Sequence, residues 1–249
     1  MRLTRDIVMV GGGDNGFNIS APLDCNMYVI DGGEELVLVD AGIGSIYGDT
    51  AQIIANMDEA GLDRSKLSKL ILTHYHSDHA GGAADLRDAF GFEVHASPLC
   101  ADVLQRGDED AIALTAAREG GMYPRDYQFR PCPALGTLVE GHSFPVGRLR
   151  VTVYETPGHS AGHLSFLVEG GDRSYLISGD LVFYGGTIVA QNIHDCVIPD
   201  YAASMIKMSG VEFDALLPGH FTISLRNGKR HVDAAAAVFR ALGMPRNAV

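Results

Sequence analysis

The sequence lacks the features that mark membrane proteins and nucleic-acid-binding proteins. No segment approaches the roughly 20 uninterrupted apolar residues that a membrane span needs. The apolar stretch from Ile7 to Val10 is too short for the core of a signal peptide. Lysine and arginine form no basic stripe, and the formal net charge of the 249 residues is −12. Because a negative field repels phosphate backbones and anionic lipids, we expect neither a nucleic-acid nor a membrane partner.

Cysteine is also scarce and shows no pairing pattern. The cysteines lie far apart without a CxxC motif, and they are Cys25, Cys100, Cys132 and Cys196. Scattered thiols of this kind favour free cysteines in a reducing compartment over a disulfide framework. Together with the missing signal peptide, this pattern predicts a cytoplasmic protein.

Short apolar runs recur along the chain and alternate with amphipathic segments. Hydrophobic residues make up 46% of the chain, which is enough for a sizeable core. The runs are bounded by Gly, Asp or Pro, as buried strands are, and cover residues 27–30, 36–39, 70–72, 149–153, 164–168, 175–177 and 215–217. Helical patterns cover residues 51–60, 82–90, 101–105, 108–119, 201–209 and 231–242. We therefore predict a single α/β domain over residues 1–249, with sheets covered by helices.

The segment 100–133 differs from the rest of the chain. It is rich in charge, contains Gly120 and Gly121, and shows no strong strand pattern. These features predict a helical insertion or a lid. An ordinary surface helix followed by a long loop is the alternative.

Histidine is concentrated in one short loop. Residues 74–79 read His-Tyr-His-Ser-Asp-His and follow the predicted strand that ends at Leu72. Alternate residues of an extended backbone point to the same face, so His74 and His76 leave the strand together. Asp78 and His79 follow as the chain turns toward the predicted helix. Imidazole nitrogens and carboxylate oxygens suit zinc, iron and manganese, so this pattern predicts a metal site.

Three further candidate ligands follow the ends of later predicted strands. Each comes directly after a glycine, and the pairs are Gly158–His159, Gly179–Asp180 and Gly219–His220. A residue without Cβ lets the backbone turn sharply and approach the site closely. Each pair alone is a weak signal. Their order after HxHxDH indicates that they complete the metal site.

This order of residues resembles the metallo-β-lactamase superfamily. The family pattern has an early Asp, then HxHxDH, His, Asp and His, and the match spans Asp40 to His220. The resemblance implies a four-layer αββα sandwich with the metals at one edge, between two central sheets. It also implies two divalent metal ions, with zinc expected and iron or manganese as alternatives.

The resemblance further implies a role for each residue. The first metal would be held by His74, His76 and His159, the second by Asp78, His79 and His220, with Asp180 as the bridge. Asp40 would orient a ligand or its loop without binding metal, although a turn-capping role is the alternative. Asp78 would also serve as the catalytic proton shuttle.

Three further residues lie near this pattern. His163, four residues after His159, is expected to make structural hydrogen bonds. Tyr184 lies four residues beyond Asp180, where its phenol could reach a substrate oxygen or could simply pack. His194 is a second candidate for the substrate pocket.

The predicted site implies a hydrolytic mechanism. Two cations about 3.5–4 Å apart can share a water and lower its pKa to near neutrality. The resulting metal-bound hydroxide attacks a polarised carbonyl, and cation charge stabilises the oxyanion. The sequence contains no GxSxG motif, and no cysteine lies in the metal pattern. We therefore predict a metal-dependent hydrolase that cleaves a small-molecule ester, lactone or thioester, similar to the lactonase and glyoxalase II branches.

Other activities are alternatives. A β-lactam hydrolase is disfavoured by the missing signal peptide and by Asp180, because those enzymes generally lack a bridging carboxylate. A mono-iron oxidoreductase of the sulfur dioxygenase type and a binding or sensor protein also stay open. Only 29 residues follow His220, which argues against a C-terminal glutathione-binding domain. We expect a small-molecule substrate and leave a homodimer open.

Overall fold

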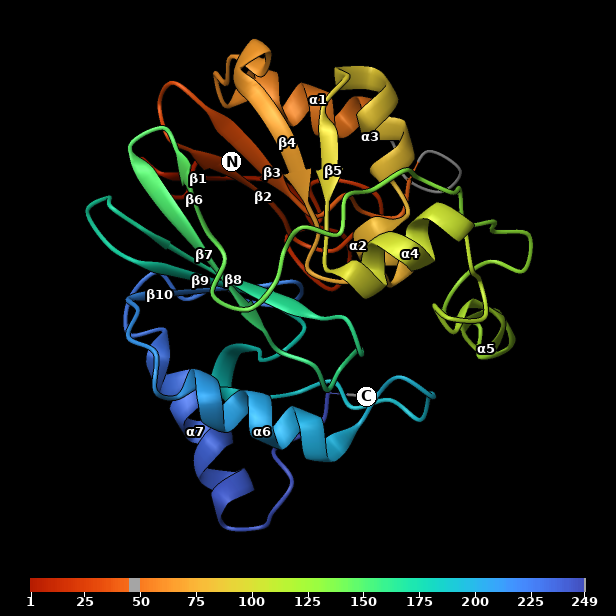
Figure 1. Ribbon diagram of the computed structural model, residues 1–249, viewed down its shortest axis with the longest axis vertical. Helices are drawn as coiled ribbons and strands as arrows, with labels where there is room; N and C mark the ends of the chain where they lie inside the picture. Colours follow the sequence, from red (N-terminus) through yellow and green to blue (C-terminus); the bar gives the residue numbers. More distant parts are fainter. Residues whose placement is uncertain (45–49, 249) are drawn as a thin grey trace.

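Two five-stranded sheets pack face to face in the computed structural model, which describes residues 1–44 and 50–248 (Figure 1). The first sheet has the order β1-β2-β3-β4-β5. Its strands are β1 (Ile7–Gly11), β2 (Met27–Asp31), β3 (Leu36–Val39), β4 (Leu67–Ile71) and β5 (Glu93–His95). Strands β1 to β3 are antiparallel, whereas β3, β4 and β5 run parallel.

The second sheet has the order β10-β9-β8-β7-β6. Its strands are β6 (Ser143–Val146), β7 (Leu149–Glu155), β8 (Leu164–Glu169), β9 (Tyr175–Gly179) and β10 (Ala215–Pro218). Strands β6 to β9 are antiparallel, and β10 pairs parallel with β9. Each sheet therefore combines antiparallel hairpins with a parallel section whose strands are joined through helices.

Helices cover the outer faces of both sheets (Figure 1). Those from the first half are α1 (Thr50–Glu59), α2 (Ser77–Ala80), α3 (Ala83–Phe90), α4 (Pro98–Arg106) and α5 (Leu114–Glu119). The second sheet is covered by α6 (Ile198–Met208) and α7 (Lys229–Arg240). This order of layers is the predicted αββα sandwich.

The buried side chains form three clusters, one at each interface between layers. Strand β1 illustrates the division, because Val8 and Val10 face the helices whereas Ile7 and Met9 face the other sheet. This alternation follows from the two-residue period of a strand. The third cluster joins the second sheet to α6 and α7.

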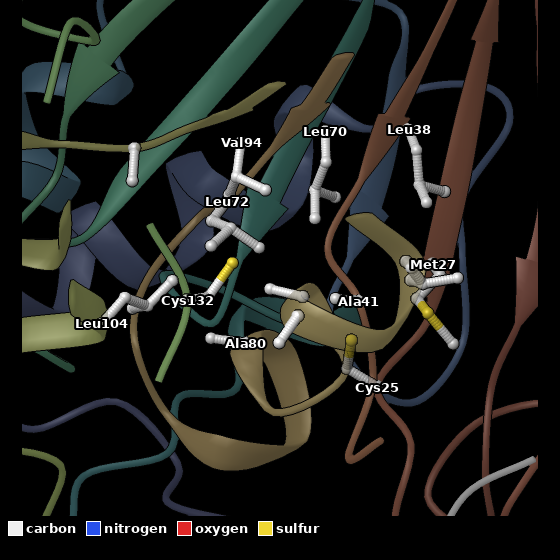
Figure 2. Close-up of a cluster of buried hydrophobic side chains, with 14 of the residues drawn as sticks. Cys25, Met27, Leu38, Ala41, Leu70, Leu72, Ala80, Val94, Leu104 and Cys132 are labelled. Atoms are coloured by element: carbon white, nitrogen blue, oxygen red, sulfur yellow. The ribbon is translucent and has the colours of Figure 1, made fainter. Parts of the chain in front are cut away.

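All four cysteines are free in the part of the chain that the structure describes, as the sequence predicts. Figure 2 shows Cys25 and Cys132 within the apolar cluster beneath the first sheet, among side chains such as Leu72 and Ala80. Burial raises the pKa of the Cys25 thiol to about 12, so it is a neutral packing group. Within residues 1–44 and 50–248, no helix is long and apolar enough to cross a membrane.

The structure corrects several predicted boundaries. Strand β4 ends at Ile71, one residue before the predicted end. Helix α2 begins at Ser77, so Asp78 and His79 are already helical. The helix predicted over 108–119 is shorter, because Ala113 has a left-handed φ of 54° and α5 begins only after it.

Candidate metal centre

The candidate ligands gather at one edge of the sandwich, where strands from both sheets end. Strands β3 and β4 are followed by Asp40 and by the loop His74 to His79, and strands β7, β9 and β10 by His159, Asp180 and His220. Parallel strands end at the same edge of a sheet, which brings these segments together. Hydrogen bonds join the two sheets here, since Leu164 N donates to the carbonyl of Thr73 at 2.7 Å.

The first group consists of three imidazoles. His76 Nδ1 lies 3.1 Å from His74 Nε2 and 3.0 Å from His159 Nε2. Three nitrogens held by one tetrahedral zinc ion would lie roughly 3.3 Å apart. The spacing of this group therefore suits a single ion.

The tautomers of His159 and His76 follow from the hydrogen bonds of the ring nitrogens that point away from the group. His159 Nδ1 donates to the Val189 carbonyl at 2.9 Å, and His76 Nε2 lies 3.2 Å from the Asp195 carboxylate. Because both acceptors require an N–H, His159 Nε2 and His76 Nδ1 carry bare lone pairs in the neutral rings. Two bare lone pairs that face each other need a cation between them. The residues present therefore fit a divalent metal ion.

The second group combines two imidazoles with a carboxylate. His79 Nε2 lies 3.2 Å from His220 Nε2, and Asp78 Oδ2 lies 3.0 Å from His220 Nε2. On its other side, His79 Nδ1 donates to Asp40 Oδ2 at 3.0 Å. Asp40 Oδ1 also accepts from Thr73 N at 2.8 Å, so Asp40 both orients His79 and holds the strand end.

Asp180 lies between the two groups. Its Oδ1 is 3.4 Å from His79 Nε2, and its Oδ2 is 3.5 Å from both His159 Nε2 and His220 Nε2. Its Oδ1 is buried and accepts no hydrogen bond within the described residues. A buried carboxylate oxygen without a donor is costly unless a cation is close.

Two glycines explain why the backbone can come so close. A Cβ on Gly219 would lie 2.3 Å from Asp180 Oδ1 and 2.6 Å from His79 Cε1. Gly179 has a left-handed φ of 49°, and a Cβ there would lie 2.6 Å from His163 Nε2. Any other side chain at these two positions would displace a candidate ligand or its support.

The charge states differ between the two groups. Burial, together with the surrounding imidazoles, lowers the pKa of His74 well below its ordinary value, and burial lowers that of His159 to about 4. Burial opposes charge on His220 as well, but Asp180 and Asp78 raise its pKa above the ordinary value. Acidic neighbours likewise outweigh burial at His79 and raise its pKa.

A family model covers most of the chain. The model of the metallo-beta-lactamase superfamily matches residues 21–220, a range that includes every candidate ligand. The chain belongs to the metallo-beta-lactamase superfamily. This assignment agrees with the αββα layers and with the order of the residues at the edge of the sandwich.

Relatives within the superfamily have several names. The chain is 27% identical over 223 residues to the lactamase-like protein aptB of Emericella nidulans, covering 88% of this chain and 57% of that protein. It is 26% identical to an atrochrysone carboxyl ACP thioesterase of Aspergillus fumigatus, covering 78% and 50%. It is 28% identical to a hydroxyacylglutathione hydrolase of Rhodopseudomonas palustris, covering 69% and 54%. The chain thus spans about half the length of these relatives.

Solved structures of the superfamily share the fold. A Cronobacter sakazakii metallo-beta-lactamase superposes with a TM-score of 0.72 at 20% identity, covering 97% of this chain and 96% of that one. A metallo-beta-lactamase family protein from Thermus thermophilus gives a TM-score of 0.72 at 21% identity, covering 96% and 81%. At this identity, the likeness shows the architecture alone.

The other predicted site residues differ in their relation to the candidate metal centre. His163 makes structural hydrogen bonds, as expected, because its Nε2 accepts from Asp180 N at 3.0 Å and its Nδ1 lies 2.8 Å from Thr156 Oγ1. The structure does not bring Tyr184 to the ligands. Its ring packs on His231 at 4.4 Å and its hydroxyl meets Arg230, both in α7. Of the two alternatives for Tyr184, these contacts support packing.

His194 borders a cavity of about 350 Å³ between the α5 region and the loop before α6. The residues that line it are Asp110, Ala113, Thr115, Ala116, Glu119, Asn192, Ile193 and His194. The next residue, Asp195, is buried and contacts the candidate ligand His76.

Asp195 is a functional candidate that the sequence analysis missed. Its Oδ2 lies 3.2 Å from His76 Nε2 and accepts from the Tyr75 hydroxyl at 2.9 Å. Although burial opposes its charge, these two donors lower the pKa of Asp195 to about 2. A carboxylate behind a ligating histidine fixes the ring and raises its basicity.

We expect Asp195→Asn to weaken metal binding at the three-imidazole group by about 10-fold or more, within the 10–100-fold range of such changes. The amide keeps the size of the side chain but removes the anionic acceptor from His76. Competition with a chelator measures the affinity. Asp200→Asn, at an exposed position in α6, is the control. Unchanged affinity in the Asp195 variant would show that the carboxylate does not support this ligand.

A fall in pH should release the metal at the second group first. Since the pKa values of His79 and His220 are raised, a metal must displace protons from these rings at a higher pH than from an ordinary imidazole. The pKa of His159 is lowered to about 4 and that of His74 lies well below its ordinary value, so these two rings stay neutral in mild acid. As the pH falls through neutrality, affinity at the second group should therefore fall more steeply than at the first, by up to about tenfold per pH unit for each displaced proton. Zinc titrations across this range would contradict the assignment if both sites weakened in parallel.

Proposed function

We propose that this chain is a dinuclear metallohydrolase that cleaves a small-molecule ester, lactone or thioester. The observation that carries the proposal is the position of Asp180. Its Oδ1 lies 3.4 Å from His79 Nε2, and its Oδ2 lies 3.5 Å from His159 Nε2. One carboxylate that faces both ligand groups can give an oxygen to each of two cations. This favours two zinc ions over a single iron.

The two groups of candidate ligands have different roles in the proposed reaction. When bound, two divalent cations lower the pKa of a shared water and provide charge for the oxyanion. The first site would carry three neutral imidazoles and a share of Asp180 only, so its ion would keep more positive charge than the ion of the second site, which suits the polarisation of a carbonyl. Asp78 and Asp180 place two carboxylates at the second site. Asp78 is the proposed proton shuttle; its Oδ1 accepts from the Tyr123 hydroxyl at 2.8 Å, and its Oδ2 faces the ligand group, 3.0 Å from His220 Nε2.

The names of the relatives support acyl transfer to water as the reaction class. They include an ACP thioesterase and a hydroxyacylglutathione hydrolase, at 26% and 28% identity. Since the chain covers about half of each relative, the carrier that they recognise is not transferred to it.

The cavity beside the centre favours an uncharged substrate. We take this cavity as the substrate site because His194, which lines it, is followed in the chain by Asp195, which contacts His76. No lysine or arginine stands among the described residues that line it, whereas Asp110 and Glu119 contribute two carboxylates. An acidic lining repels anionic carriers such as glutathione or coenzyme A, so we favour a neutral acyl chain or a lactone ring.

A hydrolysis panel tests this function. Zinc-loaded protein is offered lactones, thioesters with neutral or anionic thiols, β-lactams and phosphodiesters of comparable size. We expect turnover of a lactone or of a thioester with a neutral thiol, together with two zinc ions per chain. Preferred turnover of a β-lactam or a phosphodiester would overturn the proposed substrate class. One iron per chain with oxygen uptake would instead identify a dioxygenase.

A further inference from the structure

Tyr123 reaches from the segment after α5 into the second ligand group. Its side chain is buried, and its hydroxyl donates to Asp78 Oδ1 at 2.8 Å. The other oxygen, Asp78 Oδ2, lies 3.0 Å from His220 Nε2 and 3.8 Å from His79 Nε2. The two oxygens of this carboxylate therefore have separate partners, a phenol on one side and the ligand group on the other.

The segment that carries Tyr123 is held in place by its own contacts. Arg118 donates to both oxygens of Glu109 at 2.8 and 2.9 Å, and Glu109 Oε1 also accepts from Phe129 N at 3.1 Å. The Tyr127 hydroxyl donates to the Ile43 carbonyl at 3.0 Å. The Tyr123 and Tyr127 rings pack at 5.6 Å. The phenol at position 123 is thus presented by an anchored segment.

A carboxylate ligand is fixed in orientation when a hydrogen-bond donor holds its second oxygen. The terminal torsion of an aspartate is broad, so an unsupported Asp78 could rotate, exchange its oxygens or bind through both. A phenol is a protonated donor at neutral pH. Burial, and then the neighbouring Asp78, raises the pKa of Tyr123 well above its ordinary value, which keeps the hydrogen on the oxygen.

We propose that Tyr123 is a positioning residue for the second metal: it holds Asp78 Oδ1 so that only Oδ2 is presented to the ion. This inference rests on the two-metal function proposed above. It gives the segment 100–133 a specific role, because the segment completes the support of a ligand in the loop 74–79. It also places the supports of the two sites on different segments, with Asp195 behind the first and Tyr123 behind the second.

A metal titration of Tyr123→Phe tests the inference. Zinc is added to metal-free protein in competition with a chelator, and the two binding steps are resolved. We expect the second step to weaken 10–100-fold and the first step to match the wild type. Tyr127→Phe is the matched control, because it removes a phenol in the same segment that bonds to a backbone carbonyl instead of a ligand. Because the Tyr127 phenol helps to anchor the segment, its loss should weaken the second step much less than Tyr123→Phe does and leave the first step unchanged.

The outcomes separate this inference from the proposed function. A wild-type protein with a single binding step would refute the two-metal site itself. A wild type with two steps, combined with an unchanged second step in Tyr123→Phe, would overturn the role of Tyr123 alone. Two further results would overturn the role of Tyr123. One is that Tyr127→Phe weakens the second step as much as Tyr123→Phe does, and the other is that Tyr123→Phe weakens both steps equally. Either result would show that the substitution loosens the whole segment.

A spectroscopic measurement covers the case in which Tyr123→Phe does not fold. A fluorinated tyrosine at position 123 keeps the ring and the hydroxyl but makes the hydroxyl a stronger donor. In ¹¹³Cd-loaded protein, the resonance of the second site should shift while that of the first stays in place. A spectrum with no shift at the second site would overturn the inference.

Discussion

Replacing His76 with alanine is expected to remove the metal from the first site and to lower kcat/KM at least roughly 10³-fold. Its Nδ1 is the central nitrogen of the three-imidazole group, 3.1 Å from His74 Nε2 and 3.0 Å from His159 Nε2. Without it, two imidazoles cannot hold a tetrahedral ion tightly, and neither a low-pKa water nor a polarised carbonyl is available. Metal content and steady-state rates measure the two effects.

The fold should survive this substitution. Asp195 loses its bond to His76 but keeps the Tyr75 hydroxyl at 2.9 Å, so we expect a loss of about 1–3 kcal/mol in the free energy of unfolding. His142→Ala, at an exposed histidine in the loop before β6, is the control and should retain both metals. Full activity of the His76 variant would refute its assignment as a ligand.

The α/β class and the order of the ligands were predictable from local signals in the sequence, whereas the order of the layers was implied by the resemblance to the superfamily. Strands such as β8, Leu164–Glu169, are buried on both faces and appear as apolar runs. The three later ligands, His159, Asp180 and His220, follow the ends of strands, each directly after a glycine. The clash that a Cβ on Gly219 would make with Asp180 Oδ1, at 2.3 Å, gives the physical reason for that signal.

The strands that the sequence patterns did not predict all lie at sheet edges. Strands β1 and β5 border the first sheet and β6 borders the second. An edge strand pairs on one side only, so it can be short and partly polar. Strand β6 includes Pro145 and three residues that are not fully buried, and β5 buries only Val94. Neither therefore shows a period-two apolar pattern, and β1 was recognised only as a short apolar run.

The supporting residues could not be predicted, because their contacts are made over long sequence separations. Asp195 lies 119 residues from His76, and Tyr123 lies 45 residues from Asp78. Neither belongs to a motif, and each sits in a loop without strand or helix periodicity. Tyr184 is the opposite case, a residue close in sequence to a candidate ligand but directed elsewhere. It lies only four residues from Asp180, which suggested a contact with substrate. The chain turns at Gly185, with φ of 83°, and the Tyr184 ring packs on α7.

Replacing Asp180 with asparagine is expected to reduce the metal content from two ions to one per chain and to lower kcat by about 10²–10³-fold. The amide presents one carbonyl oxygen and one NH₂ group, and the NH₂ has no lone pair to offer a cation. The fold should be retained, because Asp180 is anchored through its backbone: its N–H donates to His163 Nε2 at 3.0 Å, and its carbonyl accepts from the Tyr201 hydroxyl at 2.6 Å. Elemental analysis and steady-state kinetics provide the measurements.

The pattern of loss in the Asp180 variant distinguishes a bridge from an ordinary ligand. A bridging carboxylate contributes an oxygen and negative charge to both ions, so its loss should release the second ion and also weaken the first. Asp172→Asn, at an exposed position in the loop before β9, controls for the change in net charge and should leave both ions bound. Two ions and an unchanged rate in Asp180→Asn would exclude the bridge. Loss of the second ion with undiminished affinity for the first would instead make Asp180 a ligand of the second site only, since the loss of negative charge from a bridge weakens binding of both ions.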